Sequence, residues 1–316
     1  MKTILFRAYG GPEVLEMAEV SDPHPGPNEV RIRVRAAGVN PVDSKIRRGL
    51  LQQRLPHVLP IIPGWDVAGE VDAVGDGVTR FRVGDAVFAY ARKPVVQFGA
   101  YAEYIVLPEN QAANKPVRAS HVEAASIPLA ALTAWQSLFD AAGLRAGQSV
   151  LIHAGAGGVG GFAIQLAKQA GATVITTAGP ENHAYVRSLG ADEVIDYRAL
   201  DFRAAVSEHF PGGVDVAYDT VGGDVQTRSA DVVKPGGVLV SILAYADEAA
   251  LRARGIETRY VFVAPNREQL AELAARFDAG TLTTRIAGVL PLSEAATAHR
   301  QIETGHTAGK LVLRLD

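Results

Sequence analysis

The sequence predicts an α/β protein in which a doubly wound parallel sheet is joined to a second, β-rich domain. Three observations support this fold class. A glycine cluster separates a short apolar run from a helical pattern at 150–171, six short apolar segments alternate with helical stretches beyond about residue 119, and closely spaced strands and turns fill the first 118 residues. The length of 316 residues also favours two cores, because single cores stop growing before ~300 residues.

The first 118 residues have the texture of a β domain. Valine and isoleucine alternate with arginine over Val30–Arg35, which is typical of a half-buried strand. Glycine-containing turns separate further expected strands at Val67–Val74, Ala86–Ala91 and Tyr101–Leu107. This spacing of short strands and turns predicts a compact, barrel-like domain.

A nucleotide-binding turn is predicted at the centre of the chain. Val150–Ile152 suits a buried strand, and the apolar residues after the glycines recur at helical spacing. Between them, Gly155, Ala156, Gly157, Gly158, Val159 and Gly160 match the pattern G-x-G-x-x-G. The first glycine permits a tight turn, the second lets backbone amides approach a pyrophosphate, and the third lets the helix pack against the strand. We expect all six residues to contact a dinucleotide.

Helices and strands alternate through the second half of the chain. Val122–Ala142 is expected to be helical with an interruption at Pro128, and further strands are expected at Thr173–Thr177, Glu193–Tyr197, Val214–Asp219, Val238–Ile242 and Tyr260–Val263. Six strands are the number in a doubly wound sheet with two mononucleotide-binding halves.

The C-terminal segment is predicted to hold two helices, capped by Asn266 with Gln269 and by Ser293, and a last strand at Lys310–Arg314. This segment is too short to fold alone, so the expected domains are 1–118 completed by 264–316, and 119–263.

The residues that follow the expected strand Thr173–Thr177, the second of the nucleotide-binding domain, indicate which dinucleotide binds. An acid about 20 residues beyond the glycines commonly holds the ribose hydroxyls of NADH. Here Ala178 and Gly179 follow the strand, and no acid appears before Glu181. Small residues leave room for a 2′-phosphate, which favours NADPH. His183, Arg187 and Tyr197 are candidates to approach that phosphate, with ordinary surface positions as the alternative.

Charge and composition exclude several classes of function. The net charge of -3 gives no electrostatic reason to expect nucleic acid or an anionic membrane as a partner. Glycine or charge interrupts every apolar stretch well before ~18 residues, so we expect a cytoplasmic protein. The absence of cysteine excludes disulfides, thiol nucleophiles and zinc ligation by cysteine.

Motifs along nearly the whole chain resemble the medium-chain dehydrogenase/reductase superfamily, in its zinc-free, zeta-crystallin-like quinone oxidoreductase branch. They are Ala37–Asp43 (AGVNPVD), Pro63–Gly69 (PGWDVAG), Gly84–Val87 (GDAV), Ala131–Trp135 (ALTAW), the glycine turn, Leu189–Asp192 (LGAD) and Gly309–Leu313 (GKLVL). The resemblance implies a GroES-like domain at 1–118 with 264–316, a Rossmann domain at 119–263, and NADPH in the cleft between them.

The resemblance also bears on zinc. Zinc-dependent relatives hold the metal with two cysteines and a histidine, whereas the matching positions after Val39 and Gly64 are here Asn40 and Trp65. We therefore expect no metal. Without a Lewis acid, alcohol dehydrogenation loses its main electrostatic aid, while reduction of a quinone or an activated enone remains feasible.

Several site residues follow from the resemblance. It implies that Asn40 lies by the nicotinamide and the substrate and that Thr133 lies near the carboxamide; a turn-capping asparagine and a helix hydroxyl are the alternatives. Lys45 replaces a tyrosine found in many quinone reductases, and it either meets the substrate or points to solvent. Trp65 and Tyr90 are candidates for an aromatic wall, or simple packing. We also expect cofactor contacts from Val221, Leu243, Phe262, Val263 and Lys310, and structural hydrogen bonds from Asp43 and Asp66 to loop amides.

The function expected from these observations is transfer of hydride from NADPH to a quinone or an α,β-unsaturated carbonyl without zinc. The alternatives are an enoyl-thioester reductase of the same superfamily and a non-catalytic NADPH-binding or sensing protein. Relatives commonly pair the last strands of their Rossmann sheets, and Arg259–Val263 is an apolar edge, so we expect a homodimer.

Overall fold

The computed structural model describes residues 1–315 and divides the chain into two compact units. The first unit comprises Met1–Leu132 and the chain from Ala264 onward, and the second comprises Thr133–Val263. Contacts within the fold define these units; the domain limits expected from the sequence, 1–118 and 119–263, stay predictions. Among the described residues, none of the helices has the length and apolar character needed to cross a bilayer.

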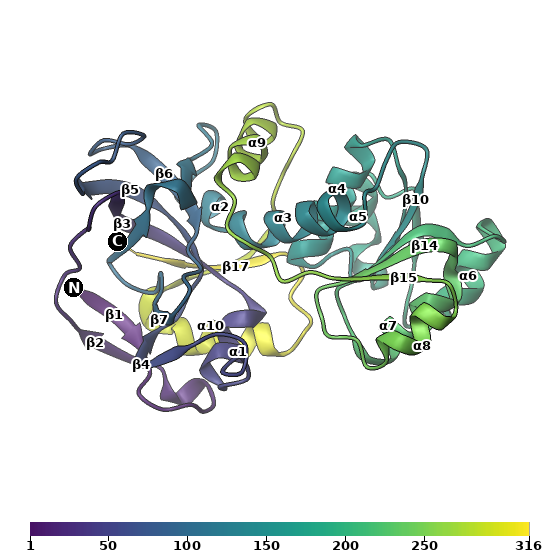
Figure 1. Ribbon diagram of the computed structural model, residues 1–316, viewed down its shortest axis with the longest axis horizontal. Coiled ribbons are helices and arrows are strands. Elements are labelled where there is room, and N and C mark those ends of the chain that lie inside the picture. The colour runs from purple at the N-terminus through teal and green to yellow at the C-terminus, as the bar shows by residue number, and fades with distance from the viewer. Residues whose placement is uncertain (316) are drawn as a thin grey trace. The chain divides into compact units, whose positions relative to one another are not determined.

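A seven-stranded sheet forms the centre of the first unit (Figure 1), and its strands run in the order β16-β17-β3-β5-β6-β9, with β8 paired to β3. The strands are β3 (Glu29–Val39), β5 (Asp66–Val74), β6 (Ala86–Tyr90), β8 (Tyr104–Pro108), β9 (Ala112–Asn114), β16 (Ile286–Pro291) and β17 (Lys310–Arg314). Val30, Ile32 and Val34 are buried, as their alternation with arginine predicts. The strand expected from Tyr101 begins at Tyr104.

The C-terminal segment completes this sheet. β17 pairs antiparallel with the end of β3, so that Leu311 lies opposite Val39 and Leu313 opposite Ala37. Leu311 and Leu313 belong to the same buried cluster as Ile32 and Val67. The first unit therefore needs both ends of the chain for one core.

Two small strand pairs and several helices surround this sheet. The pairs are β1 (Lys2–Leu5) with β2 (Glu16–Glu19), and β4 (His57–Ile62) with β7 (Val96–Phe98); the helices are α1 (Pro41–Arg47), α2 (His121–Ala125), α9 (Arg267–Asp278) and α10 (Ala295–Glu303). Short 3-10 turns occupy Pro12–Val14, Glu109–Gln111 and Leu292–Glu294.

The two predicted C-terminal caps differ in outcome. Asn266 caps α9, since its Oδ1 accepts from the backbone N–H of Gln269 at 3.0 Å. The prediction for Ser293 was wrong, because this residue lies inside the 3-10 turn that leads directly into α10. Glu294 stands at the N-cap position of α10 and makes no side-chain cap.

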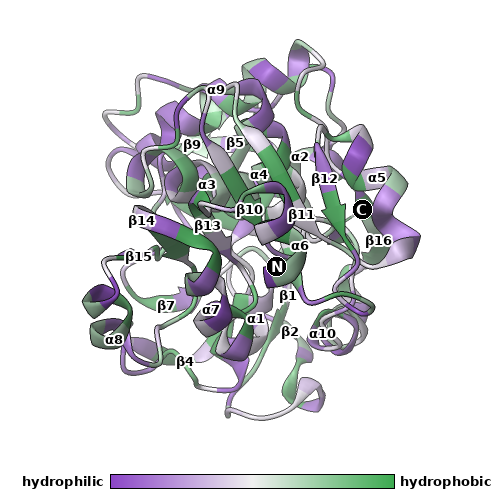
Figure 2. Ribbon diagram, turned by 90° about the vertical axis from the view of Figure 1, so that its right-hand side faces the viewer, coloured by the Kyte–Doolittle hydropathy of each residue, from purple (hydrophilic) through white to green (hydrophobic). Residues whose placement is uncertain are grey.

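The second unit is a doubly wound parallel sheet, as predicted. Its order is β12-β11-β10-β13-β14-β15, and β10 is buried along its length among mostly hydrophobic strands (Figure 2). The strands are β10 (Ser149–Ile152), β11 (Thr173–Thr177), β12 (Glu193–Ile195), β13 (Val214–Asp219), β14 (Val233–Ser241) and β15 (Glu257–Tyr260). The strand order reverses between β10 and β13, where ligands of such sheets bind.

The last strand lies three residues earlier than predicted. Residues 261–263 carry the apolar pattern from which we expected a strand, but β14 ends at Ser241, which pairs with Tyr260. Within residues 1–315, the ladder between β14 and β15 ends at this pair. The neighbouring strand β14 therefore sets the end of β15. The residue pattern of the β15 segment alone does not show where β14 ends.

Helices connect the strands of the second unit. α3 (Pro128–Trp135) begins at the proline that interrupts the predicted helix and continues as a π-helix at Gln136–Ala141. The others are α4 (Gly158–Gln169), α5 (His183–Ser188), α6 (Phe202–His209), α7 (Gly223–Ser229) and α8 (Glu248–Ala253), with 3-10 turns at Pro180–Asn182 and Ala230–Val232.

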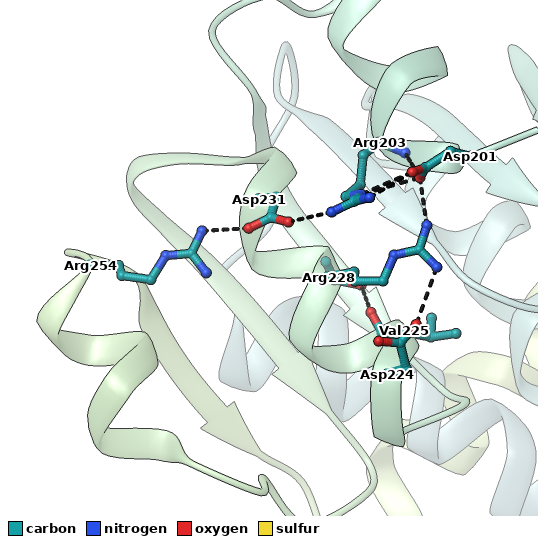
Figure 3. Close-up of polar contacts among 8 residues, drawn as sticks. Asp201, Arg203, Asp224, Val225, Arg228, Asp231 and Arg254 are labelled. Carbon is teal, nitrogen blue, oxygen red and sulfur yellow. Dashed lines mark hydrogen bonds and ion pairs between the residues drawn. The ribbon is translucent and has the colours of Figure 1, made fainter.

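Charged side chains link these helices at the surface (Figure 3). Arg203 pairs with Asp201 at 2.7 Å and with Asp231 at 3.1 Å, while Arg228 also pairs with Asp201, at 2.6 Å. The full set, which we call the arginine–aspartate network, is Asp201, Arg203, Asp224, Arg228, Asp231 and Arg254.

Candidate active site

The glycine turn of the second unit joins β10 to α4 as predicted. A Cβ on Gly155 would lie 2.1 Å from Thr176 Oγ1, and a Cβ on Gly160 would lie 2.3 Å from the backbone oxygen of Ala154. Both distances are far below van der Waals contact, so the strand, turn and helix pack this closely only with glycine. α4 begins after Gly157, and its first amides lack intrahelical acceptors. This is the geometry that accepts a pyrophosphate at a helix N-terminus.

The end of β11 fixes the turn. Thr177 Oγ1 accepts from the backbone N–H of Ala154 at 3.1 Å, and Thr177 O accepts from Gly155 N at 3.0 Å. His153 is buried, with its Nε2 2.9 Å from Ser229 Oγ and its Nδ1 3.3 Å from Thr177 Oγ1. Burial lowers the pKa of His153 to about 4, so the imidazole is neutral at pH 7. The turn is thus preorganised by uncharged hydrogen bonds.

A second polar group holds the loops after β13 and β14. Asp219 Oδ1 accepts from the backbone N–H groups of Val221 and Gly222 at 2.9 and 2.8 Å, and Asp219 Oδ2 accepts from Ser241 Oγ at 2.7 Å. Ser241 Oγ in turn accepts from Leu243 N at 3.0 Å. Asp219 therefore links the loops that carry Val221 and Leu243, two predicted cofactor residues. Sequence reasoning missed this role, although an acid at the end of a buried strand was its signal.

The segment after β11 holds the residues expected near the adenosine ribose. Ala178 is 3% exposed, and its carbonyl oxygen lies 3.1 Å from His183 Nε2. Tyr197 is 49% exposed, and the Arg198 guanidinium lies 5.5 Å from the centre of its ring. Glu181 pairs with Arg198 through two hydrogen bonds, at 2.9 and 3.1 Å. Arg198 and Glu181 were not among the predicted site residues; Arg198 places a cation beside Tyr197, and Glu181 balances that charge.

The remaining predicted cofactor residues of the second unit are spread over its elements. Thr133 lies in α3, is 3% exposed, and its carbonyl oxygen accepts from Tyr218 Oη at 3.4 Å. Phe262 and Val263 follow β15, the former partly exposed and the latter buried. The exposed Arg187 lies in α5.

In the first unit, three buried polar side chains meet where β3, β5 and β17 come together. We call Asn40, Asp66 and Lys310 the Asn40 cluster; their exposed fractions are 1%, 0% and 5%. Lys310 Nζ donates to Asn40 Oδ1 and lies 3.5 Å from Asp66 Oδ2, while Asn40 Nδ2 donates to Asp66 Oδ2 at 2.9 Å. Asp66 Oδ1 accepts from the backbone N–H of Leu129 at 2.7 Å. The contacts with Lys310 and Asp66 therefore fix the orientation of the Asn40 side-chain amide.

Burial dominates the electrostatics of this cluster. Desolvation raises the pKa of Asp66, against which the Lys310 charge and the Asn40 hydrogen bond act. Desolvation likewise lowers the pKa of Lys310, and the Asp66 charge opposes that shift. Because each ion is the main counterion of the other, removing one leaves a buried charge unpaired.

Asp43 begins a row of contacting side chains next to the Asn40 cluster. Its Oδ2 accepts from the backbone N–H of Asn40 at 2.8 Å and from Tyr101 Oη at 3.3 Å, which with the Asp66–Leu129 contact confirms the structural role expected for both aspartates. Tyr101 Oη lies 3.4 Å from His299 Nε2, and Arg47 Nη1 donates to His299 Nδ1 at 3.1 Å. Sequence reasoning missed these partners, because Asp43, Tyr101 and His299 lie far apart along the chain.

Burial sets the pKa values of Asp43 and His299. Burial, with the charge of Asp66, raises the pKa of Asp43 to about 7, although the Asn40 amide opposes the shift. Burial beside the Arg47 guanidinium lowers the pKa of His299 to about 3, so this imidazole is neutral. Asp43 Oδ1 has no hydrogen-bond partner among the described residues.

The other predicted catalytic residues also belong to the first unit. Trp65 and Tyr90 are 4% and 0% exposed, and their rings form an edge-to-face pair with centroids 6.0 Å apart. Tyr90 Oη is buried without a partner in the described part of the chain. Lys45 lies partly exposed on α1, and burial lowers its pKa. Trp65 and Tyr90 are thus together, as are Asn40 and Lys310.

Zinc in proteins is held by thiolate, imidazole and carboxylate ligands. The chain contains no cysteine, and residues 1–315 contain no group of three or more histidine, aspartate or glutamate side chains placed to hold a metal. The Asn40 amide oxygen is already taken by Lys310, and an indole occupies position 65. The metal-free site stays a prediction.

Comparisons with known proteins extend over the whole chain. Residues 26–117 match the family model of the alcohol dehydrogenase GroES-like domain, and residues 189–313 match that of a zinc-binding dehydrogenase domain. A quinone oxidoreductase of Pseudomonas aeruginosa is 39% identical over 99% of both chains. An NADPH-dependent alkenal/one oxidoreductase of Arabidopsis thaliana is 36% identical over 99% of this chain and 79% of its own.

Solved structures agree with these relatives. The quinone oxidoreductase of Coxiella burnetii has a TM-score of 0.91 and 38% identity, covering 100% of this chain and 99% of its own. The Escherichia coli quinone oxidoreductase complexed with NADPH has a TM-score of 0.90 and 31% identity, covering 100% of both chains. The chain belongs to the medium-chain dehydrogenase/reductase superfamily, in its quinone oxidoreductase branch.

Proposed function

We propose that this protein is an NADPH-dependent oxidoreductase that reduces a quinone or an α,β-unsaturated carbonyl without zinc. The observation that carries the proposal is the 39% identity to a quinone oxidoreductase over 99% of both chains. Relatives named for alkenal/one and 2-methylene-furan-3-one reduction, each 36% identical, support the activated-enone class.

The glycine turn would hold the dinucleotide. The absence of a Cβ at Gly155 and Gly160 lets the strand, the turn and α4 pack closely, and α4 begins there without a side-chain cap. The amides of its first turn would then be available to a pyrophosphate. Val221 and Leu243 belong to loops already fixed by Asp219 and Ser241. When bound, NADPH would supply hydride from C4 of its nicotinamide.

The preference for NADPH over NADH rests on the segment after β11. Ala178 and Gly179 place no acid at the strand end, and Arg198 offers a cation near Tyr197. Glu181 already pairs with this cation, so a 2′-phosphate would have to displace the glutamate. We therefore expect NADPH to bind more tightly than NADH, by a margin that the Arg198–Glu181 pair limits.

The Asn40 cluster would act on the substrate side by position and charge. Lys310 and Asp66 hold the Asn40 amide in one orientation, so no reorganisation is needed when a ligand arrives. Reduction of a quinone or enone leaves negative charge on an oxygen, which needs only a hydrogen bond or a proton from water. Lys45 of α1, partly exposed and at the position of the tyrosine of related enzymes, is the cation that we propose meets that charge.

The test is consumption of NADPH by the purified protein, followed by its absorbance, with 9,10-phenanthrenequinone and a panel of alkenals as acceptors. Turnover with these acceptors that survives treatment with EDTA is expected. Crotonyl-CoA belongs in the panel, because faster turnover of it would instead favour an enoyl-thioester reductase. Micromolar NADPH binding without turnover of any acceptor would contradict the proposal and favour a sensing role.

We also propose a cytoplasmic homodimer that binds neither nucleic acid nor membrane. β15 is an edge strand of the parallel sheet, and Tyr260 at its end is 36% exposed. An open strand edge readily pairs with another chain. Sedimentation velocity is expected to give twice the monomer mass, and a monomer at micromolar concentration would refute the dimer.

A further inference from the structure

The first unit contains a cavity of about 660 Å³. Apolar side chains from several of its elements line most of the wall, among them Leu5, Val20, Ile62, Phe98 and Ile105. Within the described chain, no residue that we propose for cofactor or substrate contact belongs to this lining. The volume is that of a pocket for a small organic molecule.

One cation that lines this cavity, Lys93, makes no hydrogen bond or ion pair within the described residues, although the charge of Glu29 acts on it. Lys93 lies in the loop between β6 and β7. Glu29 also lines the cavity, but its Oε2 accepts from the backbone N–H of Gly26 at 2.9 Å. Desolvation lowers the pKa of Lys93 to about 8. A cation in this position would gain from an anionic partner.

One acceptor in the lining is also unpartnered. Gln111 ends the 3-10 turn Glu109–Gln111, and its Oε1 is buried without a hydrogen-bond partner within residues 1–315. A buried acceptor left without a donor costs free energy. A ligand N–H or O–H would remove that cost, just as an anion would remove the cost at Lys93.

We propose that this cavity is a second ligand site, separate from the proposed reductase site, for an apolar monoanion that carries an N–H or O–H group. The apolar body would cover the side chains of the lining, a carboxylate or sulfonate would pair with Lys93, and the donor would meet Gln111 Oε1. One charge is favoured over two, because Lys93 makes no ion pair while the negative charge of Glu29 also acts in this cavity and would repel a second anionic group. The N-terminal ammonium of Met1 is already paired with Asp22 at 2.9 Å.

Two probes separate the contributions of the two polar groups. The dye 8-anilinonaphthalene-1-sulfonate has an anionic sulfonate and an N–H donor, whereas decanoate has only the anion. Dye fluorescence is titrated on the full chain with saturating NADPH present, so that a dinucleotide site is filled, and decanoate is then added as competitor. We expect the dye to bind in the presence of saturating NADPH. We expect decanoate to displace the dye and so reduce its fluorescence.

Three variants assign that site to the cavity. Lys93→Met is expected to weaken both probes roughly tenfold, as loss of a charge-assisted hydrogen bond does. Gln111→Leu should weaken the dye several-fold while leaving decanoate within about twofold, because only the dye donates a hydrogen bond. Lys2→Met, at an exposed lysine outside the lining, is the matched control and should change neither.

The probe titrations on these variants either support or overturn the second site. Loss of both probes in Lys93→Met, with Lys2→Met unchanged and the melting temperatures of all variants alike, supports the second site. Equal binding of both probes to the wild-type protein and to Lys93→Met overturns it, as does a dye signal that NADPH abolishes completely. NADPH oxidation is not a readout here, so failure of this site and failure of the proposed reductase activity remain distinguishable.

Discussion

At the residue scale, the orientation of Asn40 depends on two ions of opposite charge. Lys310 occupies its carbonyl oxygen, and Asp66 occupies its amide nitrogen. Replacing either ion changes the charge balance of a buried site and the hydrogen bonds of the amide together. Stability and site geometry are therefore coupled at this point.

Lys310→Met should lower the free energy of unfolding by about 3 kcal/mol, because it leaves Asp66 as an unpaired buried charge. The double variant with Asp66→Asn should recover part of this loss. The neutral amide introduced at position 66 can accept from Leu129 N as the carboxylate does, and its nitrogen can donate to a turned Asn40. Urea denaturation of the two single variants and the double variant measures the coupling. Additive losses would show that the three side chains do not act together.

Asp43 predicts a dependence of stability on pH. Its pKa is about 7 in the folded protein and 3.8 ordinarily, so between these values the folded state binds more protons than the unfolded state. The contribution of Asp43 to stability is therefore largest below about pH 4 and declines as pH rises to about 7. Asp43→Asn should remove this slope.

The measurement is the difference in unfolding free energy between wild type and Asp43→Asn across that range, in which the other titrating groups cancel. Glu13→Gln serves as the control, since Glu13 is an exposed carboxylate of the Pro12–Val14 turn. If the difference in unfolding free energy between the wild type and Asp43→Asn does not change with pH, the raised pKa of Asp43 is contradicted.

At the scale of elements, the glycine turn makes the sharpest prediction. Gly160→Ala places a Cβ 2.3 Å from a backbone oxygen of the turn, so β10 and α4 must separate. A stability loss of about 2 kcal/mol and a large loss of NADPH affinity are expected. In Gly161→Ala the new Cβ would meet the Tyr185 hydroxyl at 3.3 Å, the end of a long side chain.

Gly161→Ala is thus the matched control, with stability within about 1 kcal/mol of wild type since alanine favours the helix interior. Calorimetry and fluorescence titration with NADPH give both quantities. Equal NADPH affinity in the two variants would remove the turn from the proposed cofactor site.

Elements were predictable from the sequence where the signal is local. The β10 to α4 unit, the alternation of β3 and the break at Pro128 each depend on spacing within one segment, and the structure has them. The end of β15 and the cap of α10 were not predictable in this way. A neighbouring strand sets the first, and the 3-10 turn before the helix sets the second.

The same reason explains what was missed at the candidate site. Asn40 and Lys310 could be named from motifs, but their hydrogen bond joins residues 270 positions apart. Tyr101, His299 and Asp219 act by holding other residues, and a single sequence does not show which residues they will reach. Arg198 stood beside Tyr197 in the sequence, and its pairing with Glu181 needed the fold.

The arginine–aspartate network belongs to several helices at once, and its members are partly exposed. Arg203→Met should destabilise the second unit less than Lys310→Met destabilises the first, since exposed pairs gain little net energy. The loss should vanish near 1 M salt, where the Debye length is roughly 3 Å. Thermal denaturation at low and high salt provides the comparison, and a loss that persists at high salt would show that packing of Arg203 matters instead.

At the scale of the whole molecule, each compact unit carries one of the two tryptophans. Trp65 lies in the first unit and Trp135 in the second. Trp65→Phe and Trp135→Phe therefore give two proteins whose fluorescence reports one unit each. The adenosine fragment 2′,5′-ADP should shift only the Trp135 transition in urea, by about 2.7 kcal/mol at a hundred times its Kd.

The control is adenosine without phosphates, which lacks the groups that the glycine turn and the segment after β11 are proposed to bind. Equal shifts of both tryptophan transitions would mean that the two units unfold as one. A shift confined to Trp65 would contradict the assignment of the dinucleotide to the second unit.

The path of the chain has one more consequence, for synthesis. β17 pairs with β3, and both flank the second unit in sequence. A ribosome therefore releases the complete parallel sheet while the first unit still lacks its last strands. During that interval the buried edge of β3 at Ala36–Val39 has no β17 neighbour and is open to wrong partners. The first unit can close its sheet only after Lys310–Arg314 have been made, so its core is completed later than that of the second unit.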